Sequence, residues 1–256
     1  MAMKGVLKSA IVGTPLESFV RALRSRIRYY AAPRHVRMNR MYNAQTVAVM
    51  SRILRPNSHC IDVGCSRGTV LKEIMRIAPG GSHFAFEPLP QYAAQLRKDY
   101  PGVSIHELAL SDTAGTARFN FVTEYPGRSG LRKRTYPSDS VDIQEITVRT
   151  ERLDNVIPQD REIAFMKIDV EGAEYQVVAG GLDTIRRDKP FIVFEHGIGG
   201  SDHYGTSPEM MYDILRSADL QISIMADWLA GRPALSRQAF VRQYSKGPNW
   251  YFLAHR

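Results

Sequence analysis

The spacing of apolar positions changes repeatedly along the chain. Short apolar runs predict β-strands over residues 59–63, 83–86, 103–108, 165–170, 191–194, 220–225 and 250–254. Between several of these runs, longer segments bounded by Pro or Gly predict helices over residues 69–78, 89–100, 173–187 and 208–218. Strands that alternate with helices of this length are typical of an α/β domain with a mostly parallel sheet covered on both faces.

The rhythm changes over residues 111–155. Polar and apolar residues alternate in residues 117–122 and 141–150, as in Arg118-Phe119-Asn120-Phe121. Alternation with a period of two indicates half-buried strands. We therefore expect an inserted antiparallel hairpin, with a polar loop over residues 123–140 between its strands.

Residues 1–58 differ in charge from the rest of the chain. They contain eleven Lys and Arg and one acid, Glu17, whereas the whole chain has a formal net charge of +8. Apolar residues at positions 16, 20, 23 and 27 predict a helix with a basic face, and a second helix is predicted over residues 41–54. We expect a basic helical extension over residues 1–58 and one domain over residues 59–256. A basic amphipathic helix leaves open a peripheral contact with a membrane surface, whereas no nucleic-acid-binding module accompanies the charge.

Composition places the chain among globular proteins. Its 256 residues are 44% hydrophobic and 23% charged, which excludes a disordered or fibrous protein. No run approaches the ~18 apolar residues of a membrane-spanning helix. Cys60 and Cys65 are the two cysteines, too few for a disulfide framework, so we expect a cytoplasmic protein.

The segment Gly64-Cys65-Ser66-Arg67-Gly68 connects the first predicted strand to a helix. Open α/β sheets bind nucleotides at such a turn, where glycines permit a sharp bend and close backbone approach. A dinucleotide site would have the spacing G-x-G-x-x-G, and this loop lacks the middle glycine. An adenosine-type ligand such as S-adenosylmethionine, which has no pyrophosphate, fits the observed spacing better.

The same loop also matches the G-x-S-x-G elbow of serine hydrolases. Ser66 would be the nucleophile, and Asp227 and His255 follow it in the order of a hydrolase triad. However, no oxyanion segment precedes the loop, and it follows the first predicted strand, whereas that fold places its elbow after several strands. We keep the hydrolase as an alternative.

Polar groups at the ends of the next strands support an adenosine ligand. Glu87, followed by Pro88, stands nineteen residues after Gly68 at the end of the second strand, where a carboxylate can accept both hydroxyls of a ribose. Asp62, at the end of the first strand, could hold the loop backbone or receive a ligand ammonium group. Ala109-Leu110-Ser111, after the third strand, would edge the adenine.

These residues belong to an ordered series that resembles the FkbM-type S-adenosylmethionine-dependent methyltransferases. The most specific element is the run Lys167-Ile168-Asp169-Val170-Glu171-Gly172-Ala173-Glu174. The others are Asp62-Val63-Gly64 with Gly68, Phe86-Glu87-Pro88, Ala109-Leu110-Ser111-Asp112 with Gly115, Thr150 to Asp154, Gly180-Gly181 and Val193-Phe194-Glu195. The resemblance covers roughly residues 59–200. It implies a Rossmann-like class I methyltransferase sheet with an antiparallel last strand, and S-adenosylmethionine bound by residues 62, 64–68, 87, 88, 109–111 and 169. It also implies O-methylation of a hydroxyl on a sugar, glycolipid or secondary metabolite, without fixing the acceptor.

The candidate catalytic groups follow two neighbouring strands. Alternation places Lys167, Asp169 and Glu171 on one side of their strand, where three charges are costly unless paired or used. We interpret Asp169 as lying near the sulfonium and Glu171 as binding or deprotonating the acceptor, since an aliphatic hydroxyl needs a base. Glu195 and His196 end the next strand and add a second acid and an imidazole. Asp169, Glu171, Glu195 and His196 could also hold a divalent metal, although no ligand spacing demands one.

The loop over residues 123–140 is basic and could cover the acceptor. It carries Arg128, Arg132, Lys133 and Arg134, which suggests an anionic acceptor. The sequence thus predicts a cytoplasmic S-adenosylmethionine-dependent O-methyltransferase. A non-catalytic binding protein that keeps the nucleotide pocket and an N-methyltransferase remain as alternatives beside the hydrolase.

Overall fold

A computed structural model describes residues 20, 32–134, 136 and 141–256 of the chain. The chain divides into two compact units, Met1–Ala44 and Gln45–Arg256. The predicted helix with apolar positions 16, 20, 23 and 27 falls largely outside the described residues. The helix α3 (Arg34–Ile53) begins in the first unit and ends in the second, and the sequence-derived boundary after residue 58 stays a prediction.

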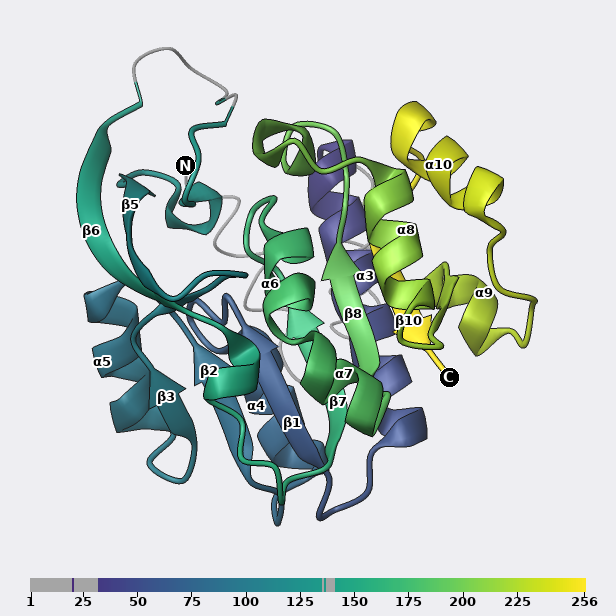
Figure 1. Ribbon diagram of the computed structural model, residues 1–256, viewed down its shortest axis with the longest axis horizontal. Helices are drawn as coiled ribbons and strands as arrows, with labels where there is room; N and C mark the ends of the chain where they lie inside the picture. The colour runs from purple at the N-terminus through teal and green to yellow at the C-terminus, as the bar shows by residue number, and fades with distance from the viewer. Residues whose placement is uncertain (1–19, 21–31, 135, 137–140) are drawn as a thin grey trace. The chain divides into compact units, whose positions relative to one another are not determined.

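The larger unit is built on a seven-stranded sheet of the described residues (Figure 1). Its order is β3 (Ser104–His106), β2 (His83–Phe86), β1 (His59–Val63), β7 (Ile163–Ile168), β8 (Phe191–Glu195), β10 (Tyr251–His255) and β9 (Gln221–Ser223). β3, β2, β1, β7 and β8 run parallel, and β10 is antiparallel to β8 and β9. The Rossmann-like sheet with an antiparallel last strand is therefore confirmed.

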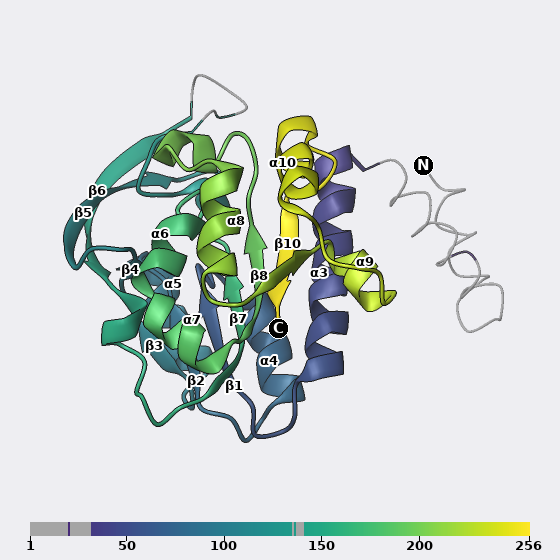
Figure 2. The same cartoon turned by 45° about the vertical axis from the view of Figure 1, so that its right-hand side comes forward.

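Helices cover both faces of this sheet. α6 (Glu174–Gly180), α7 (Leu182–Asp188) and α8 (Pro208–Arg216) lie together on one face in Figures 1 and 2. α4 (Thr69–Ile77) and α5 (Pro90–Asp99) contribute Leu71 and Leu96 to a separate cluster with Ala85 of β2. Two buried layers, one on each face, follow from the continuous apolar runs of the parallel strands.

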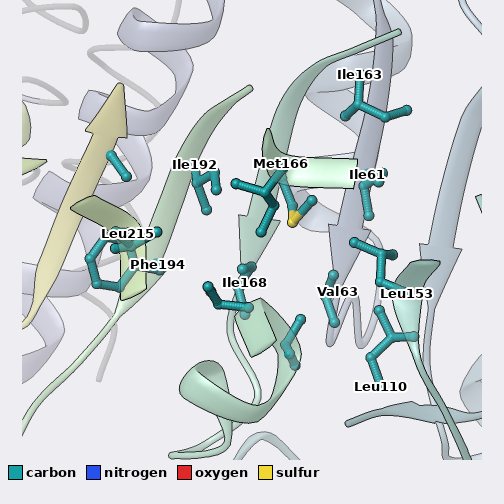
Figure 3. Close-up of a cluster of buried hydrophobic side chains, with 14 of the residues drawn as sticks. Ile61, Val63, Leu110, Leu153, Ile163, Met166, Ile168, Ile192, Phe194 and Leu215 are labelled. Carbon is teal, nitrogen blue, oxygen red and sulfur yellow. The ribbon is translucent and has the colours of Figure 1, made fainter. Parts of the chain in front are cut away.

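The main hydrophobic core lies between the sheet and α6, α7 and α8. Ile61, Val63, Met166, Ile168 and Phe194 point into it from three neighbouring strands (Figure 3). All five are almost completely buried. This core fixes the strands whose carboxyl ends carry the candidate site.

The inserted hairpin is present and includes a third strand. β5 (Gly115–Val122) pairs antiparallel with β6 (Ile143–Glu151), and β4 (Ala109–Leu110) adds to β6 in parallel. In Figure 1 the hairpin arches at the upper left, beyond the edge strand β3. Phe119 of β5 and Val148 of β6 pack on Leu89, which precedes α5, so the hairpin has its own apolar contact with the domain.

The structure corrects three features of the predicted secondary structure. The helix predicted over residues 173–187 is broken at Gly181, where a Cβ would lie 2.6 Å from Leu153 Cδ2. The helices α9 (Met225–Leu229) and α10 (Arg237–Lys246) were not predicted, because only Met225 and Phe240, respectively, are buried in them and their apolar periodicity is weak.

Short 3₁₀ helices complete the described chain at Pro126–Arg128, Leu153–Asn155 and Ser201–Tyr204. No helix of the described residues is long and apolar enough to cross a membrane.

Candidate active site

The carboxyl ends of β1, β2, β7 and β8 meet at one edge of the sheet. A cavity of about 130 Å³ opens there. Its walls come from the glycine loop, the segments after β2 and β7, and the inserted hairpin. They include Gly64, Ser66, Glu87, Pro88, Tyr92, Ala109, Leu110, Phe119, Ser129, Leu131, Asp169 and Glu171.

The glycine loop is held tightly between β2 and the segment after β7. The backbone N–H groups of Gly64 and Cys65 donate to the carbonyl oxygen of Phe86. Gly64 has φ +73°, and a Cβ at this position would lie 2.0 Å from the carbonyl oxygen of Asp169. Only glycine fits a backbone that is both left-handed and this close to another strand. The loop geometry therefore explains the glycine that the sequence analysis singled out.

Glu87 connects the loop to the next strand. Its Oε2 accepts a hydrogen bond of 2.8 Å from the backbone of Ser66, and its Oε1 accepts one of 2.9 Å from Leu89. The side chain is buried, and burial raises its pKa above the ordinary value although both backbone donors act to lower it. The carboxylate lines the cavity and has acceptor capacity left for hydroxyl groups of a ligand.

Three carboxylates lie together beside this cavity. One oxygen each of Asp169, Glu171 and Glu195 lies within 4.8 Å of the others. Asp169 Oδ2 accepts hydrogen bonds of 3.0 Å from Lys167 Nζ and 2.5 Å from the hydroxyl of Tyr251. Burial acts to raise the pKa of Asp169, but Lys167 and Tyr251 outweigh it and lower that pKa. Asp169 is therefore ionised at neutral pH.

The other acids of the cluster region behave differently. Burial and the neighbouring Asp169 charge raise the pKa of Glu195 well above its ordinary value. Burial likewise raises the pKa of Glu174 to about 7, against the lowering effect of hydrogen bonds from the backbone of Gly172 and Val170. Environments that push the pKa values of neighbouring acids apart create separate proton donors and acceptors.

A second cavity, of about 410 Å³, is lined by Glu195. It is lined by Arg134, Gly172, Glu174, Glu195, Gly197, Ile198, Gly200, Ser201, Tyr244, Ser245, Lys246, Gly247, Asn249 and Trp250. Asp169 and Glu171 line the first cavity and Glu195 lines the second. The acidic cluster therefore lies where the two cavities approach each other.

Glu171 has a partner from the inserted segment. Its carboxylate forms an ion pair with the guanidinium of Arg134. Glu171 adopts φ +59° directly after β7, an unfavourable conformation for a residue with a side chain. Of the described residues, Asp169, Glu171 and Glu195 are the group that could hold a metal ion, and Lys167, Tyr251 and Arg134 already partner two of these carboxylates.

The structure brings together many of the residues predicted from the sequence. Gly64, Ser66, Glu87, Pro88, Ala109, Leu110 and Asp169 all line the first cavity. Ala109 and Leu110 do so as strand β4, and the backbone N–H of Ser111 donates to Glu151.

Four other predicted cofactor residues do not line the first cavity. Cys65 is buried in a core cluster, and Gly68 faces Leu96 and Tyr100. The guanidinium of Arg67 lies over the ring of Tyr92, 5.8 Å from its centre. Asp62 is buried with no hydrogen-bond partner for Oδ2 among the described residues, and burial raises its pKa to about 7.

His196 does not join the acidic cluster. Its ring stacks on Phe240 and lies tilted against Tyr244, and it lines neither cavity. Burial lowers its pKa to about 4, so the imidazole is neutral. Successive side chains along a strand point to opposite sides, so Glu195 of β8 points toward the site and His196 points away from it.

The hydrolase triad does not assemble. His255 is bonded to Ser223 at 2.9 Å, and Asp227 pairs with Arg232. His255 ends the antiparallel strand β10, beyond Ala254, which is paired with Ile192 near the start of β8. Ser66 follows the carboxyl end of β1, so the two residues lie at opposite ends of the sheet.

Several site residues were missed by the sequence analysis. Tyr92, Phe119 and Leu131 line the first cavity, and Tyr251 and Glu174 belong to the acidic region. The alternation in residues 118–121 was the available signal for Phe119. No sequence signal points to Tyr251, because its position in the site depends on the pairing of β10 with β8.

The first cavity fits S-adenosylmethionine in its chemistry. Phe86, Leu108 and Phe119 offer apolar walls for a base, Glu87 offers a carboxylate for ribose hydroxyls, and Asp169 offers a negative charge. Gly64 leaves the room that a side chain would fill. The fold and this cavity define the class of Rossmann-like, S-adenosylmethionine-dependent methyltransferases. A crystal structure of the methyltransferase FkbM from Methylobacillus flagellatus KT has the same fold, with a TM-score of 0.50 and 18% identity over 83% of this chain and 47% of that one.

Residues 62–221 match the methyltransferase FkbM domain, and the chain belongs to this family. It is 27% identical over 163 residues to the 2-O-methyltransferase NoeI of Sinorhizobium fredii, covering 58% of this chain and 67% of NoeI. It is 31% identical over 161 residues to the 31-O-demethyl-FK506 methyltransferase FkbM of Streptomyces tacrolimicus, covering 51% of this chain and 62% of that protein. The chain therefore spans only part of the length of these relatives.

Proposed function

We propose that this protein transfers the methyl group of S-adenosylmethionine to a hydroxyl of a small molecule, such as a sugar, a glycolipid or a secondary metabolite. The observation that carries this proposal is the acidic cluster of Asp169, Glu171 and Glu195 between the two cavities. The first cavity suits the cofactor and the second would take the acceptor. By their names, both relatives methylate oxygen.

The residues of the first cavity would bind and orient the cofactor. Glu87 would accept the ribose hydroxyls, and the apolar walls would enclose the adenine. When bound, the cofactor supplies an electrophilic methyl group on a sulfonium sulfur. Asp169, ionised and fixed by Lys167 and Tyr251, would face that positive charge.

The residues of the cluster would then handle the proton of the acceptor. Burial and the charge of Asp169 raise the pKa of Glu195 and so favour its protonated form, in which it would donate a hydrogen bond rather than act as a base. Glu171 is the carboxylate that remains to accept the hydroxyl proton. Correct alignment of the reactants is the larger contribution to rate, and a general base adds about 10²–10⁴-fold.

We further propose a cytoplasmic location, which the two free, buried cysteines Cys60 and Cys65 support. Contact of residues 1–58 with a membrane surface remains a proposal that rests on their charge alone.

The cofactor is tested by thermal unfolding with excess S-adenosylhomocysteine or NAD. At about 100 times Kd a ligand adds about 2.7 kcal/mol of stability, so S-adenosylhomocysteine alone should raise Tm by several degrees. Glu87→Gln should abolish this shift, whereas Glu73→Gln, on the exposed side of α4 next to Arg76, should keep it. A shift with NAD instead would overturn the proposal.

The reaction is tested by release of S-adenosylhomocysteine from S-adenosylmethionine, using matched pools of hydroxyl and amine compounds. We expect turnover with hydroxyl compounds. Turnover confined to amines would replace the O-methyltransferase with an N-methyltransferase. Cofactor binding without turnover on any pool would favour the non-catalytic binding protein.

A further inference from the structure

Arg134 connects the inserted segment to the acceptor side of the site. The same segment lines the first cavity through Ser129 and Leu131, whereas Arg134 lines the second. The segment is fixed to the domain nearby, since the backbone N–H of Arg132 donates to the hydroxyl of Tyr204 at 3.0 Å. Arg134 therefore lies close to a point where the insertion is hydrogen-bonded to the rest of the domain.

The guanidinium of Arg134 has two kinds of contact. Its Nε donates a hydrogen bond of 2.6 Å to the carbonyl oxygen of Gly199, and its Nη1 pairs with Glu171. The side chain is 17% exposed, compared with 82% for Arg118 on β5. The Gly199 contact anchors the head group independently of Glu171, so Glu171 can leave without releasing Arg134 from the cavity wall.

The second cavity has few negative charges of its own. Glu195 and Glu174 line it, and burial raises the pKa of both. The charge of Asp169 is balanced by Lys167. Lys246 also lines the cavity and has no ion-pair partner among the described residues. Glu171 is the carboxylate that pairs directly with Arg134.

We propose that Arg134 is a specificity-determining residue that selects acceptors carrying a carboxylate or phosphate group near the methylated hydroxyl. Glu171 is the exchangeable counter-ion of this arginine. When the anionic group of the acceptor pairs with Arg134, Glu171 is released and becomes the base for the neighbouring hydroxyl. This inference rests on the proposed function and names the acceptor class of the same site.

The proton balance follows directly. The acceptor oxygen loses its proton to Glu171 and uses the freed electron pair to bond the methyl carbon, while the electron pair of the broken methyl–sulfur bond stays on sulfur. A neutral acceptor leaves Glu171 paired with Arg134, and a carboxylate held in an ion pair is a weaker base because the cation favours its charged form. The arrangement therefore couples recognition of the anion to activation of the hydroxyl.

The test uses full-length protein saturated with S-adenosylhomocysteine. Calorimetric titration compares methyl β-D-glucopyranosiduronate with methyl β-D-glucopyranoside, which differ by one carboxylate, and inorganic phosphate serves as a competing anion. The uronate should bind about tenfold or more tightly than the neutral glycoside, the change expected for one charge-assisted contact. Inorganic phosphate should displace the bound uronate. Displacement would show that the site also accepts a phosphate group, so that phosphate-bearing acceptors belong to the same class.

Two variants separate recognition from a merely structural ion pair. Arg134→Gln should remove the preference for the uronate, and Glu171→Gln should strengthen uronate binding because the competing counter-ion is gone. Arg118→Gln, a matched substitution of an exposed arginine that lines neither cavity, should keep the wild-type preference. A structural ion pair would instead lower Tm in both Arg134→Gln and Glu171→Gln without moving the two affinities in opposite directions.

Equal binding of the two glycosides, no binding of either, or a preference that survives Arg134→Gln would overturn this inference. If S-adenosylhomocysteine still binds in those cases, the proposed function stands and only the acceptor class is wrong. Failure of the wild-type protein to bind S-adenosylhomocysteine would overturn both.

Discussion

The hydroxyl of Tyr251 donates a 2.5 Å hydrogen bond to Oδ2 of Asp169, and this bond joins the antiparallel strand β10 to the acidic cluster. The ring of Tyr251 also lies 4.5 Å from Lys167 Nζ, measured to its centre. The strand register pairs Tyr251 with Glu195. One tyrosine thus contacts or adjoins three of the residues that the sequence predicts to be catalytic.

Tyr251→Phe should weaken catalysis by raising the pKa of Asp169. The hydroxyl is one of the groups that lower this pKa, so its loss moves protonation of Asp169 to higher pH. We expect methyl transfer to fall about tenfold, the scale of a hydrogen bond to a charged group, and the acid limb of its pH profile to move upward.

The rate is measured from pH 4 to 9 with a hydroxyl compound that supports turnover. Tyr212→Phe is the matched control, because its hydroxyl bonds to Leu235 outside both cavities. An acid limb unchanged in Tyr251→Phe would show that Asp169 does not need this bond.

His196→Phe should leave catalysis nearly intact. Neither ring nitrogen of His196 has a hydrogen-bond partner among the described residues, and the ring packs on Phe240. Replacing an unpartnered buried polar ring by an apolar one of similar shape is close to neutral for stability, or favourable. We expect urea unfolding to give equal or higher stability and the rate to stay within about threefold. A large loss of rate with unchanged stability would restore the catalytic role expected from the sequence.

The sequence predicts the strands of the sheet well and its helices less well. β1 and β2 begin and end where predicted, because each is a short, largely apolar segment bounded by polar or glycine residues. The break at Gly181 was missed, because it depends on Leu153, a residue distant in sequence. Local periodicity cannot report a contact between separate segments.

The same distinction applies to the site. Gly64 and Glu87 could be predicted because their roles depend on their place at a strand end, which a local pattern reveals. The pairing of Arg134 with Glu171 could not, because it depends on how the insertion folds back over β7. Glu171 was predicted and Arg134 was noted as one of several loop cations, but their contact is visible only in the structure.

Asp62 should contribute a loss of stability as pH rises from about 4 to 7. Burial raises the pKa of Asp62 from 3.8 to about 7. In this window the folded protein keeps a proton that the unfolded chain has lost, so stability decreases with pH and the effect ends above about pH 7. A single group of this kind contributes a slope of at most about 1.4 kcal/mol per pH unit.

Asp62→Asn removes this titration, so the slope of stability against pH should become more positive than in the wild-type protein. The free energy of unfolding in urea is measured between pH 4 and 8 for both proteins. Asp160→Asn, in which an exposed acid is replaced, should keep the wild-type slope. Equal slopes in wild type and Asp62→Asn would show that Asp62 is ionised in the folded protein.

Gly64→Ala should destabilise the domain far more than Gly231→Ala, although both glycines have nearly the same positive φ angle. Their φ angles are +73° and +70°, so both substitutions carry a similar strain of about 1–3 kcal/mol. A Cβ at position 231 meets nothing within 4 Å, whereas one at position 64 would lie 2.0 Å from the carbonyl oxygen of Asp169. The contact of this Cβ with Asp169 would force β1 away from β7 and displace one wall of the cofactor cavity.

Urea unfolding should therefore separate the two variants by several kcal/mol. S-adenosylhomocysteine should still raise the Tm of Gly231→Ala but not that of Gly64→Ala. Similar losses in both variants would mean that the loop can move away from Asp169, so that its close approach is not needed to shape the cavity.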